Sequence, residues 1–275
     1  MHDYTWTDSN GIIAEEQNGF RKKRSTVDHI SSLTNIIDTR KKFKLSTFCA
    51  FIDFRKAFDS VNRTLLWQKL ANNGMSTKML SAVRSLYQNV SACVRVNGYL
   101  TDWFKVNTGV RQGCSLSTIL FNIFLNDIAV MLKSLHKGVT IGNENVCILL
   151  YADDIVLIAE NENDLQTMLT TLNDWCISNS MCINIGKSNI VHFRPDSLQR
   201  SEYIFKCGES VVQYANSYLY LGITLTEHLD FSTTAKFVAK STNRAFGLLI
   251  AKYKNRGGLP MMFIRNCIIL VWCLL

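Results

Sequence analysis

Proline and paired cysteines are scarce in this sequence. Only two prolines occur in 275 residues, Pro195 and Pro260, so long helices and strands can run without interruption. The nine cysteines are scattered and none forms a Cys-x-x-Cys pair, which argues against a zinc site and against a disulfide framework. Buried, reduced thiols in an intracellular protein explain them best.

Segments that would direct the protein to a membrane are also missing. The first ten residues are polar and contain no apolar signal-peptide core. Met261–Leu275 is strongly apolar, but it is too short to span a bilayer and Arg265 interrupts it. We therefore expect a core helix there and no membrane partner. Because the chain stops within this apolar run, we also expect it to be a fragment of a longer protein.

The composition that is present is globular with a surplus of positive charge. Hydrophobic residues make up 47% and charged residues 19%, which is the balance of a folded chain. The net charge of +8 and the pI of about 9.0 suit a polyanionic partner. Much of this charge lies in two clusters, residues 21–24 and 40–44. Because runs of lysine and arginine are most often solvated faces, charge alone leaves both interpretations open.

The hydrophobic spacing predicts mixed helices and strands without a regular βαβ alternation. This pattern favours an α+β fold in which an antiparallel sheet is backed by helices. Asp59 or Asn62 is the expected N-cap of the second helix, and Asn97-Gly98 is a strong hairpin signal. We expect helices over 27–40, 62–71, 117–132, 163–178 and from 231 through 254, and strands over 47–54, 93–106 (a hairpin), 146–151, 155–159, 182–185, 189–193, 203–206, 211–213 and 218–224.

The strongest chemical signal is the tetrapeptide Tyr151-Ala152-Asp153-Asp154, which lies between two apolar runs. Two adjacent carboxylates repel each other and are costly to hold near a core. A cation would relieve that cost, and carboxylate oxygens suit Mg²⁺ or Mn²⁺. The alternative for an isolated Asp-Asp pair is a solvated acidic turn.

A third acid, Asp53, ends the apolar run Phe48–Ile52. An aspartate in this place is either a helix cap or a ligand. If neighbouring strands bring Asp53 to the Asp153 and Asp154 pair, three carboxylates can share two metal ions. That is the arrangement needed for in-line phosphoryl transfer. We assign Asp59 a structural role, as a cap or an ion-pair partner.

Taken together and in order, the motifs between Glu15 and Thr224 resemble those of the reverse transcriptase family, specifically the enzymes of non-LTR (LINE-type) retrotransposons. Single motifs are weak, but six in the right order and spacing are strong. The matching segments are Gln17–Arg21 with Arg24-Ser25-Thr26 (fingers), Phe51–Asp59 (motif A), Arg111–Ser117 (motif B), Tyr151–Asp154 (motif C), Asn184–Ser188 (motif D) and Tyr220-Leu221-Gly222 (motif E).

The resemblance implies a role for each of several residues. Asp53, Asp153 and Asp154 would bind two Mg²⁺ or Mn²⁺ ions, and Lys187 would donate a proton to the departing pyrophosphate. Arg21 would reach the triphosphate of the incoming deoxynucleotide, Phe58 would exclude a 2′-hydroxyl, and Gln112 would touch the nucleotide or the template. Each has a plain alternative: Arg21 and Lys187 as surface cations, and Phe58 as a core ring.

The resemblance also implies nucleic-acid contacts with an RNA template and a DNA primer. The family places the primer end against Tyr151, Tyr220, Leu221 and Gly222; for the last three the alternative is an ordinary strand and turn. The candidate contacts to the nucleic-acid backbone are Lys236, Lys240, Arg244, Lys252, Lys254 and Arg256.

A right-hand polymerase architecture follows from the same resemblance. It divides the chain into partial fingers (1–46), a palm (47–227) with a fingers insertion around 62–107, and the start of a truncated thumb (228–275). Ser115 and Thr118 stand where the family commonly has prolines, which would loosen motif B. The site of action would be intracellular, with the nucleus as a candidate compartment, and the oligomeric state is left open.

Two other functions remain to be separated from RNA-directed DNA synthesis. One is a nucleic-acid-binding remnant that has the fold of a polymerase but no turnover. The other is an RNA-copying RNA polymerase, which shares a palm and an acidic pair; Phe58 at the sugar position argues against it.

Overall fold

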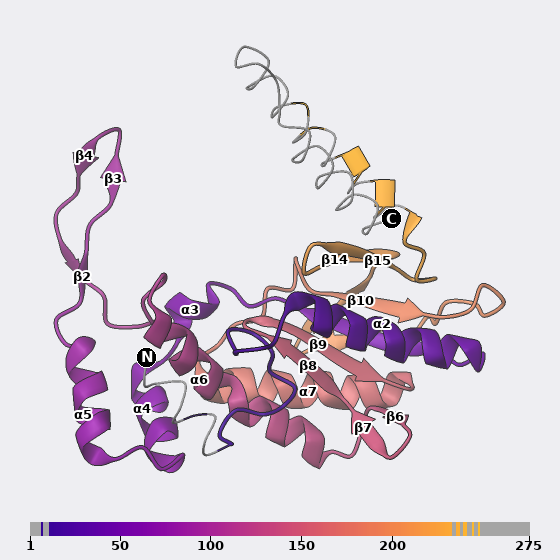
Figure 1. Cartoon of the computed structure of the whole chain (residues 1–275), viewed down its shortest axis with the longest axis horizontal. Helices are drawn as coiled ribbons and strands as arrows, with labels where there is room; N and C mark the ends of the chain where they lie inside the picture. The colour runs from indigo at the N-terminus through magenta and orange to yellow at the C-terminus, as the bar shows by residue number, and fades with distance from the viewer. Residues whose placement is uncertain are drawn as a thin grey trace, which may run out of the picture.

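A five-stranded sheet forms the centre of the protein in the computed structural model, which describes residues 7, 11–232, 235–236, 239–240, 244 and 247. The strand order is β13-β10-β1-β9-β8. Strands β8, β9 and β10 of this sheet are labelled in Figure 1. Neighbouring strands are antiparallel except β13, which runs parallel to β10. The bounds are β1 (Thr47–Ile52), β8 (Ile148–Tyr151), β9 (Asp154–Ala159), β10 (Asn189–Phe193) and β13 (Gln213–Tyr214).

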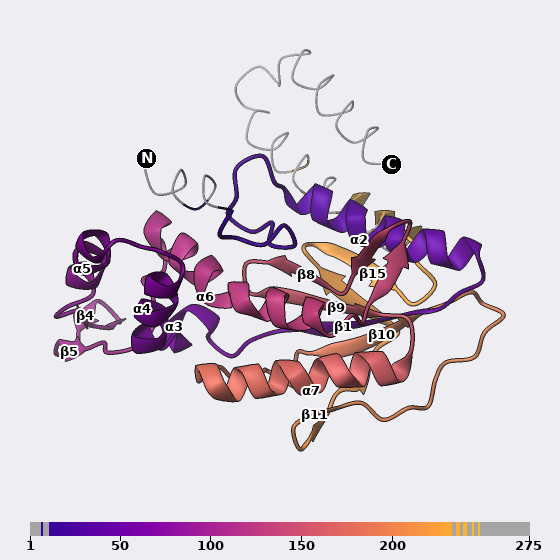
Figure 2. The same cartoon turned by 90° about the horizontal axis from the view of Figure 1, so that it is seen from below.

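Each face of the sheet is covered by other elements. Helices α6 (Ser115–Ser134) and α7 (Glu162–Asn179) pack on one face. Helix α2 (Thr26–Lys42) lies on the other, together with the hairpin of β14 (Ser217–Tyr220) and β15 (Ile223–Thr226). Figure 2 shows α2 and α7 on opposite sides of the strands.

This layering explains why the β1 sequence is continuously apolar. Alternate residues of a strand point to opposite faces. Phe48 and Ala50 therefore join the core under α6 and α7, while Cys49 and Phe51 join the core under α2. A strand buried on both faces has no position for a solvated side chain until it ends, and Asp53 follows at that end.

Smaller elements surround this centre. They are α3 (Ala57–Ser60), α4 (Arg63–Asn72), α5 (Thr77–Leu86), the paired strands β2 (Ser91–Ala92) and β5 (Phe104–Lys105), the hairpin β3 (Arg95–Val96) and β4 (Tyr99–Leu100), the hairpin β6 (Val139–Ile141) and β7 (Glu144–Val146), and the hairpin β11 (Lys206–Cys207) and β12 (Ser210–Val211).

Helix α6 is long and apolar enough to cross a bilayer by length and composition. However, 61% of its apolar window is buried inside the protein, where it packs against α4 and α7. Core packing therefore accounts for its composition.

Most of the elements expected from the sequence are confirmed. The α+β class is correct, and the helices expected at 27–40, 62–71, 117–132 and 163–178 are α2, α4, α6 and α7. Asn62 caps α4 by accepting hydrogen bonds from two backbone N–H groups, those of Thr64 and Leu65, so the alternative cap Asp59 is wrong. The seven cysteines among the described residues are free thiols, as expected, but only four are buried: Cys93 and Cys114 are partly exposed and Cys182 is exposed.

Several strand predictions are wrong. Residues 211–213 do not form one strand but are divided between β12 and β13. Residues 182–185 form only an isolated bridge between Ile183 and Phe54, because Asn184 begins a tight turn. The segment 203–206 has no ladder before β11 begins at Lys206. Residues 218–224 form the two strands β14 and β15, because Leu221 and Gly222 adopt positive φ and reverse the chain. Helix α5 and the β6–β7 hairpin were not expected from the pattern.

The helix expected from residue 231 is described only in part. Lys236, Lys240 and Arg244 are helical and exposed. The expected core helix at 261–275 and the cations Lys252, Lys254 and Arg256 lie outside the described residues.

A histidine is buried on the α2 side of the sheet. His29 is 0% exposed, and its ring lies 5.7 Å from that of Tyr151 and 5.8 Å from that of Tyr220. Asn18 Nδ2 lies 3.1 Å from His29 Nδ1 and donates to it. Burial lowers the pKa of His29 from 6.5 to about 4, because the charged imidazolium would lose its hydration.

We predict that this histidine makes the fold sensitive to acid. The unfolded chain takes up the proton near pH 6.5 and the folded chain only near 4, so His29 lowers the free energy of unfolding as pH falls through that window. Urea-unfolding midpoints at pH 7.5, 6 and 5 should fall less steeply for His29→Gln than for the unsubstituted chain. Contributions from the carboxylates cancel in this difference, and parallel curves for the two proteins would contradict the assignment.

Candidate active site

The end of strand β1 brings Asp53 next to the β8–β9 hairpin. The last pair of the β1–β9 ladder is Ile52 with Ile155, so Asp53 continues the register opposite Asp154. Asp153 precedes it in the turn that joins β8 to β9. Asp53 lies a hundred residues before Asp153 and Asp154 in sequence. The fold brings it to them at the ends of neighbouring strands of one sheet, as the expected site requires.

Asp53 is oriented by the segment Asn184–Ser188. Its backbone N–H donates to Ser188 Oγ at 3.1 Å, and its carbonyl accepts from the Asn184 N–H at 2.8 Å. Asn184 Nδ2 also donates to Asp53 Oδ2 at 2.9 Å. Lys187 lies in the same turn with an exposed side chain. The turn therefore places the predicted proton donor beside the end of β1.

Gln17 of the fingers motif holds the turn that joins β8 to β9. The side-chain amide of Gln17 accepts from the Ala152 N–H at 3.0 Å and donates to the Ala152 carbonyl at 3.3 Å. Ala152 has φ +57, a strained conformation for a residue with a Cβ. Gly19 packs so closely that an added Cβ would stand 2.1 Å from Ala152 N. Only glycine fits there.

The carboxylates of Asp53, Asp153 and Asp154 lie close enough together for their negative charges to repel. Burial, followed by the charges of Asp153 and Asp53, raises the pKa of Asp154 from 3.8 to about 6. Burial also raises the pKa of Asp153, and the Asp53 charge adds to that rise. The three groups therefore act on one another, and a cation among them would offset their repulsion.

The donor set fits a hard divalent cation, because it consists of carboxylate oxygens. Among the described residues, however, no three His, Cys, Asp or Glu side chains form a ready-made metal cluster. Asp53 Oδ2 accepts the hydrogen bond from Asn184, and its other oxygen and the carboxylates of Asp153 and Asp154 would supply ligands to a bound ion.

Two of the predicted nucleotide-binding residues share a cavity. Phe58 and Gln112 both line a hollow of about 540 Å³ next to α6, together with Phe20. The Phe58 ring stacks on Phe121 of α6, with centroids 4.4 Å apart and planes at 14°. Phe20 meets the same ring edge-on at 6.3 Å. These contacts fix the orientation of the Phe58 ring while leaving it partly exposed.

Arg21, the third predicted nucleotide-binding residue, is engaged elsewhere. Its guanidinium donates to the carbonyls of Ala14 and Gln17, each at 3.1 Å, and to Glu15 at 3.4 Å. Its side chain is 14% exposed. Contact with a triphosphate would require these bonds to be exchanged. In this conformation Arg21 supports the turn that carries Gln17.

The predicted primer-binding residues differ in their exposure to solvent. Tyr220 is 1% exposed and packs against His29 and Phe51, so its side chain supports the hairpin from within the core. Leu221 and Gly222 form the tip of the β14–β15 hairpin, and Leu221 is partly exposed. Tyr151 is partly exposed beside the acids.

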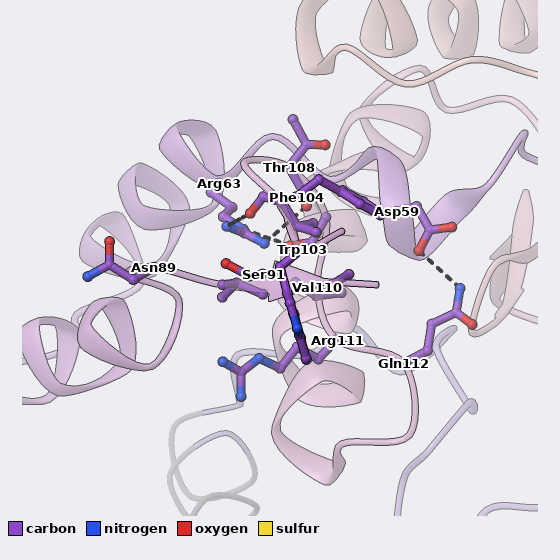
Figure 3. Close-up of a pocket in the computed structure, with 14 residues that line it drawn as sticks. Asp59, Arg63, Asn89, Ser91, Trp103, Phe104, Thr108, Val110, Arg111 and Gln112 are labelled. Carbon is purple, nitrogen blue, oxygen red and sulfur yellow. Dashed lines mark hydrogen bonds between the residues drawn. The ribbon is translucent and has the colours of Figure 1, made fainter. Parts of the chain in front are cut away.

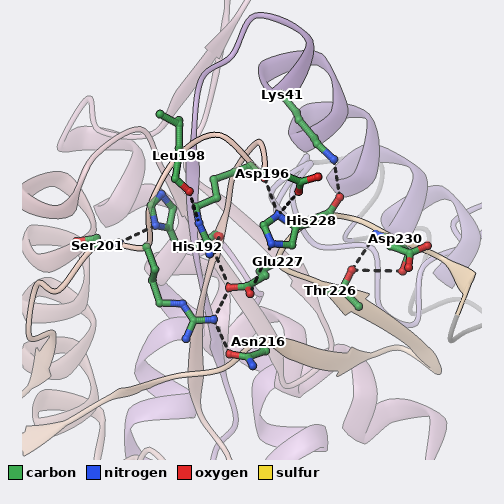
Figure 4. Close-up of polar contacts among 12 residues, drawn as sticks. Lys41, His192, Asp196, Leu198, Ser201, Asn216, Thr226, Glu227, His228 and Asp230 are labelled. Atoms are coloured by element: carbon green, nitrogen blue, oxygen red, sulfur yellow. Dashed lines mark hydrogen bonds and ion pairs between the residues drawn. The ribbon is translucent and has the colours of Figure 1, made fainter.

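Ion pairs anchor the far end of this hairpin to the sheet (Figure 4). Glu227 follows β15 and accepts from Arg194, which follows β10, at 2.7 Å. Arg200 pairs with the same carboxylate. Lys41 at the end of α2 donates to the carbonyl of His228 at 2.6 Å. The β14–β15 hairpin is therefore held near its tip by the buried Tyr220 side chain and at its other end by these polar contacts.

Sequence reasoning missed the residues that hold the site together. The sequence analysis assigned no individual role to Gln17 or Asn184. In the structure Gln17 is hydrogen-bonded to Ala152, which precedes Asp153, and Asn184 is hydrogen-bonded to Asp53. Asp59 is neither a cap nor an ion-pair partner among the described residues; it accepts a hydrogen bond from Gln112 Nε2 at 3.1 Å. No local signal could have found these pairs, which are separated by more than fifty residues.

Comparison with known sequences identifies one family. The family described as "Reverse transcriptase (RNA-dependent DNA polymerase)" matches residues 5–225. A Pol polyprotein from a type-1 retrotransposable element R2 of Popillia japonica is 29% identical over 174 residues, which cover 62% of this chain and 24% of that protein. The RNA-directed DNA polymerase from mobile element jockey of Drosophila melanogaster is 27% identical and covers 83% of this chain. The aligned region spans 25% of that protein, so this chain corresponds to a minor part of such relatives.

Comparison with solved structures supports the same fold. Apo telomerase from Candida tropicalis superposes with a TM-score of 0.54 at 14% identity, over 82% of this chain and 38% of that one. A telomerase of the same organism lacking its C-terminal domain gives a TM-score of 0.53 at 19% identity, over 74% of this chain and 38% of that one. These likenesses show that the sheet and its helices share the fold of telomerase, which is consistent with a polymerase palm. With the family match over residues 5–225 and its acids at one end of the central sheet, the chain belongs to the reverse transcriptase family, and its relatives are those of non-LTR retrotransposons.

Proposed function

We propose that this chain carries the polymerase core that copies RNA into DNA by nucleotidyl transfer. The observation that carries the proposal is the approach of Asp53 to Asp153 and Asp154 on adjacent strands, where burial and then the neighbouring carboxylate charges raise the pKa values of Asp153 and Asp154. The relatives named as RNA-directed DNA polymerases support it.

The residues that would hold two Mg²⁺ or Mn²⁺ ions are Asp53, Asp153 and Asp154. Bound there, the ions would lower the pKa of the primer 3′-hydroxyl and neutralise charge on the leaving pyrophosphate. Gln17 keeps the Asp153 turn in place, and Asn184 and Ser188 orient Asp53. Lys187, in the turn that touches Asp53, would give a proton to the pyrophosphate.

The deoxynucleotide would occupy the cavity lined by Phe58 and Gln112. The stack of Phe58 on Phe121 holds a flat ring rigidly, and a ribose 2′-hydroxyl would clash with such a surface. Arg21 would contact the triphosphate after leaving its present carbonyl partners.

The RNA template and the DNA primer would be bound mainly through phosphates. Leu221 and Gly222 at the hairpin tip, and partly exposed Tyr151 next to the acids, would meet the primer end. The exposed cations Lys236, Lys240 and Arg244 would contact the duplex backbone, so binding should weaken steeply with salt. Reverse transcription of this kind would take place inside the cell, the nucleus being one such compartment.

The metal-ligand assignment predicts the effect of a single substitution. In primer extension on poly(rA)·oligo(dT) with Mg²⁺, Asp153→Asn should reduce the rate by ~100-fold or more, because one charge of the metal site is removed. Asp174→Asn, on the exposed side of α7, is the matched control and should extend normally. Extension by Asp153→Asn at the control rate would refute the assignment, and absence of extension by the unsubstituted chain would favour the inactive remnant.

The sugar-gate assignment makes an independent prediction. Phe58→Ala should lower the preference for dNTPs over rNTPs by roughly 10- to 100-fold, because the ring that meets the 2′ position is lost. The measurement is kcat/KM for dTTP and UTP on the same template, with exposed Phe43→Ala as the control. An unchanged preference would make Phe58 a packing residue, and equal use of both sugars by the unsubstituted chain would favour an RNA polymerase.

A further inference from the structure

The first residue of helix α4 makes an unusual set of contacts. The guanidinium of Arg63 donates hydrogen bonds to the carbonyls of Gly109 at 2.8 Å, Val106 at 2.8 Å and Thr108 at 3.0 Å. A fourth, longer bond reaches the carbonyl of Tyr87 at 3.4 Å. Figure 3 shows the Arg63 guanidinium directed at this backbone. Three of the four acceptors lie in residues 106–113, here called the motif B loop.

The other side of the motif B loop is fastened to α3 and the residue that follows it. The Gly109 N–H donates to the Val61 carbonyl at 2.9 Å, and the Val110 N–H donates to the Phe58 carbonyl at 2.8 Å. Gly109 has φ +80, and an added Cβ would stand 2.7 Å from the Asp59 carbonyl oxygen. The loop therefore lies flush against the backbone of the residue proposed to select the sugar.

Open space lies behind this loop. A cavity of about 1050 Å³ is lined by loop residues Thr108 to Gln112 and, across from them, by Trp103 and Phe104. Gln112 also lines the cavity proposed for the nucleotide. Gln112 is thus common to both hollows. Val110 is buried, but the part of the loop that faces the larger hollow has open space on that side and depends on hydrogen bonds to keep its position.

Arginine is suited to this role by its chemistry. Its planar guanidinium carries five N–H donors in a rigid fork, so it can reach several carbonyls at once, whereas the lysine ammonium is a single point. The Tyr87 ring lies 5.1 Å from Arg63 Cζ and adds a cation–π contact that limits rotation of the fork.

We propose that Arg63 is a positioning residue for nucleotide selection, which holds the motif B loop against Phe58–Val61 so that Gln112 and the Phe58 ring face the incoming nucleotide. This inference rests on the proposed function. Arg63 itself does not line the nucleotide cavity. Its influence passes through the carbonyls of the loop and the Val110–Phe58 hydrogen bond.

The kinetic test compares Arg63→Gln and Arg63→Lys with Arg84→Gln, which alters an exposed arginine of α5. Arg63→Gln should raise the KM for dTTP by about tenfold, the cost of roughly one charge-assisted hydrogen bond, with kcat within about threefold. The preference for dTTP over UTP should fall in parallel, and Arg63→Lys should be intermediate. If Arg63 only stabilised the fold, the fraction of active enzyme would fall, while KM and sugar preference would stay unchanged. That result would overturn the inference.

A second measurement needs no catalysis. Arg111 is exposed within the motif B loop, so trypsin cleavage after Arg111 reports how firmly the loop is held. Cleavage there should be several-fold faster in Arg63→Gln than in the unsubstituted chain and in Arg84→Gln. Equal cleavage in Arg63→Gln and the unsubstituted chain would contradict the proposal that Arg63 holds the loop, even if the chain extends primers. Failure of the unsubstituted chain to extend primers would instead contradict the proposed function and leave the cleavage result to decide the role of Arg63.

Discussion

Negative charge held at the end of a buried sheet is the constraint on which this structure depends. Strand β1 is covered on both faces, so a polar group can appear only where the strand ends, and Asp53 stands there. The neighbouring hairpin places Asp154 opposite, and burial with mutual repulsion raises its pKa to about 6. Such an arrangement is costly for stability and useful for binding cations, which is the usual balance at a functional site.

The contacts around the acids keep this unfavourable arrangement in place. Gln17 bonds both backbone groups of Ala152, and Gly19 allows the approach. On the other side, the turn that begins at Asn184 holds Asp53 through its N–H, its carbonyl and one carboxylate oxygen. Motifs A, C and D and the fingers motif are therefore joined by hydrogen bonds between residues far apart in the chain. The motif B loop is joined to motif A in the same manner, with Arg63 on its open side.

Several arginines of this basic chain make contacts within the fold. Arg21 donates to two backbone carbonyls, and Arg40 is buried against Glu160 at 3.0 Å. Arg194 and Arg200 both pair with Glu227 beneath the β14–β15 hairpin. A guanidinium has enough donors to satisfy several carbonyls or carboxylates at once, so a basic cluster in a sequence does not reveal which of its members are free.

Local chemistry in the sequence predicted most of the elements and drew attention to the three acids. The continuous apolar run before Asp53, the helical stripes of α2, α6 and α7, and the Asn97-Gly98 turn each depend on interactions within a few residues. The order of the motifs was enough to identify the family. Tertiary structure alone decided that Leu221 and Gly222 reverse the chain, that residues 182–185 wrap around Asp53 instead of forming a strand, and that Tyr220 points into the core. It also decided the partners of Gln17, Asn184 and Arg63, because a hydrogen bond across forty or more residues depends on how the sheet and helices pack and leaves no periodicity in the sequence.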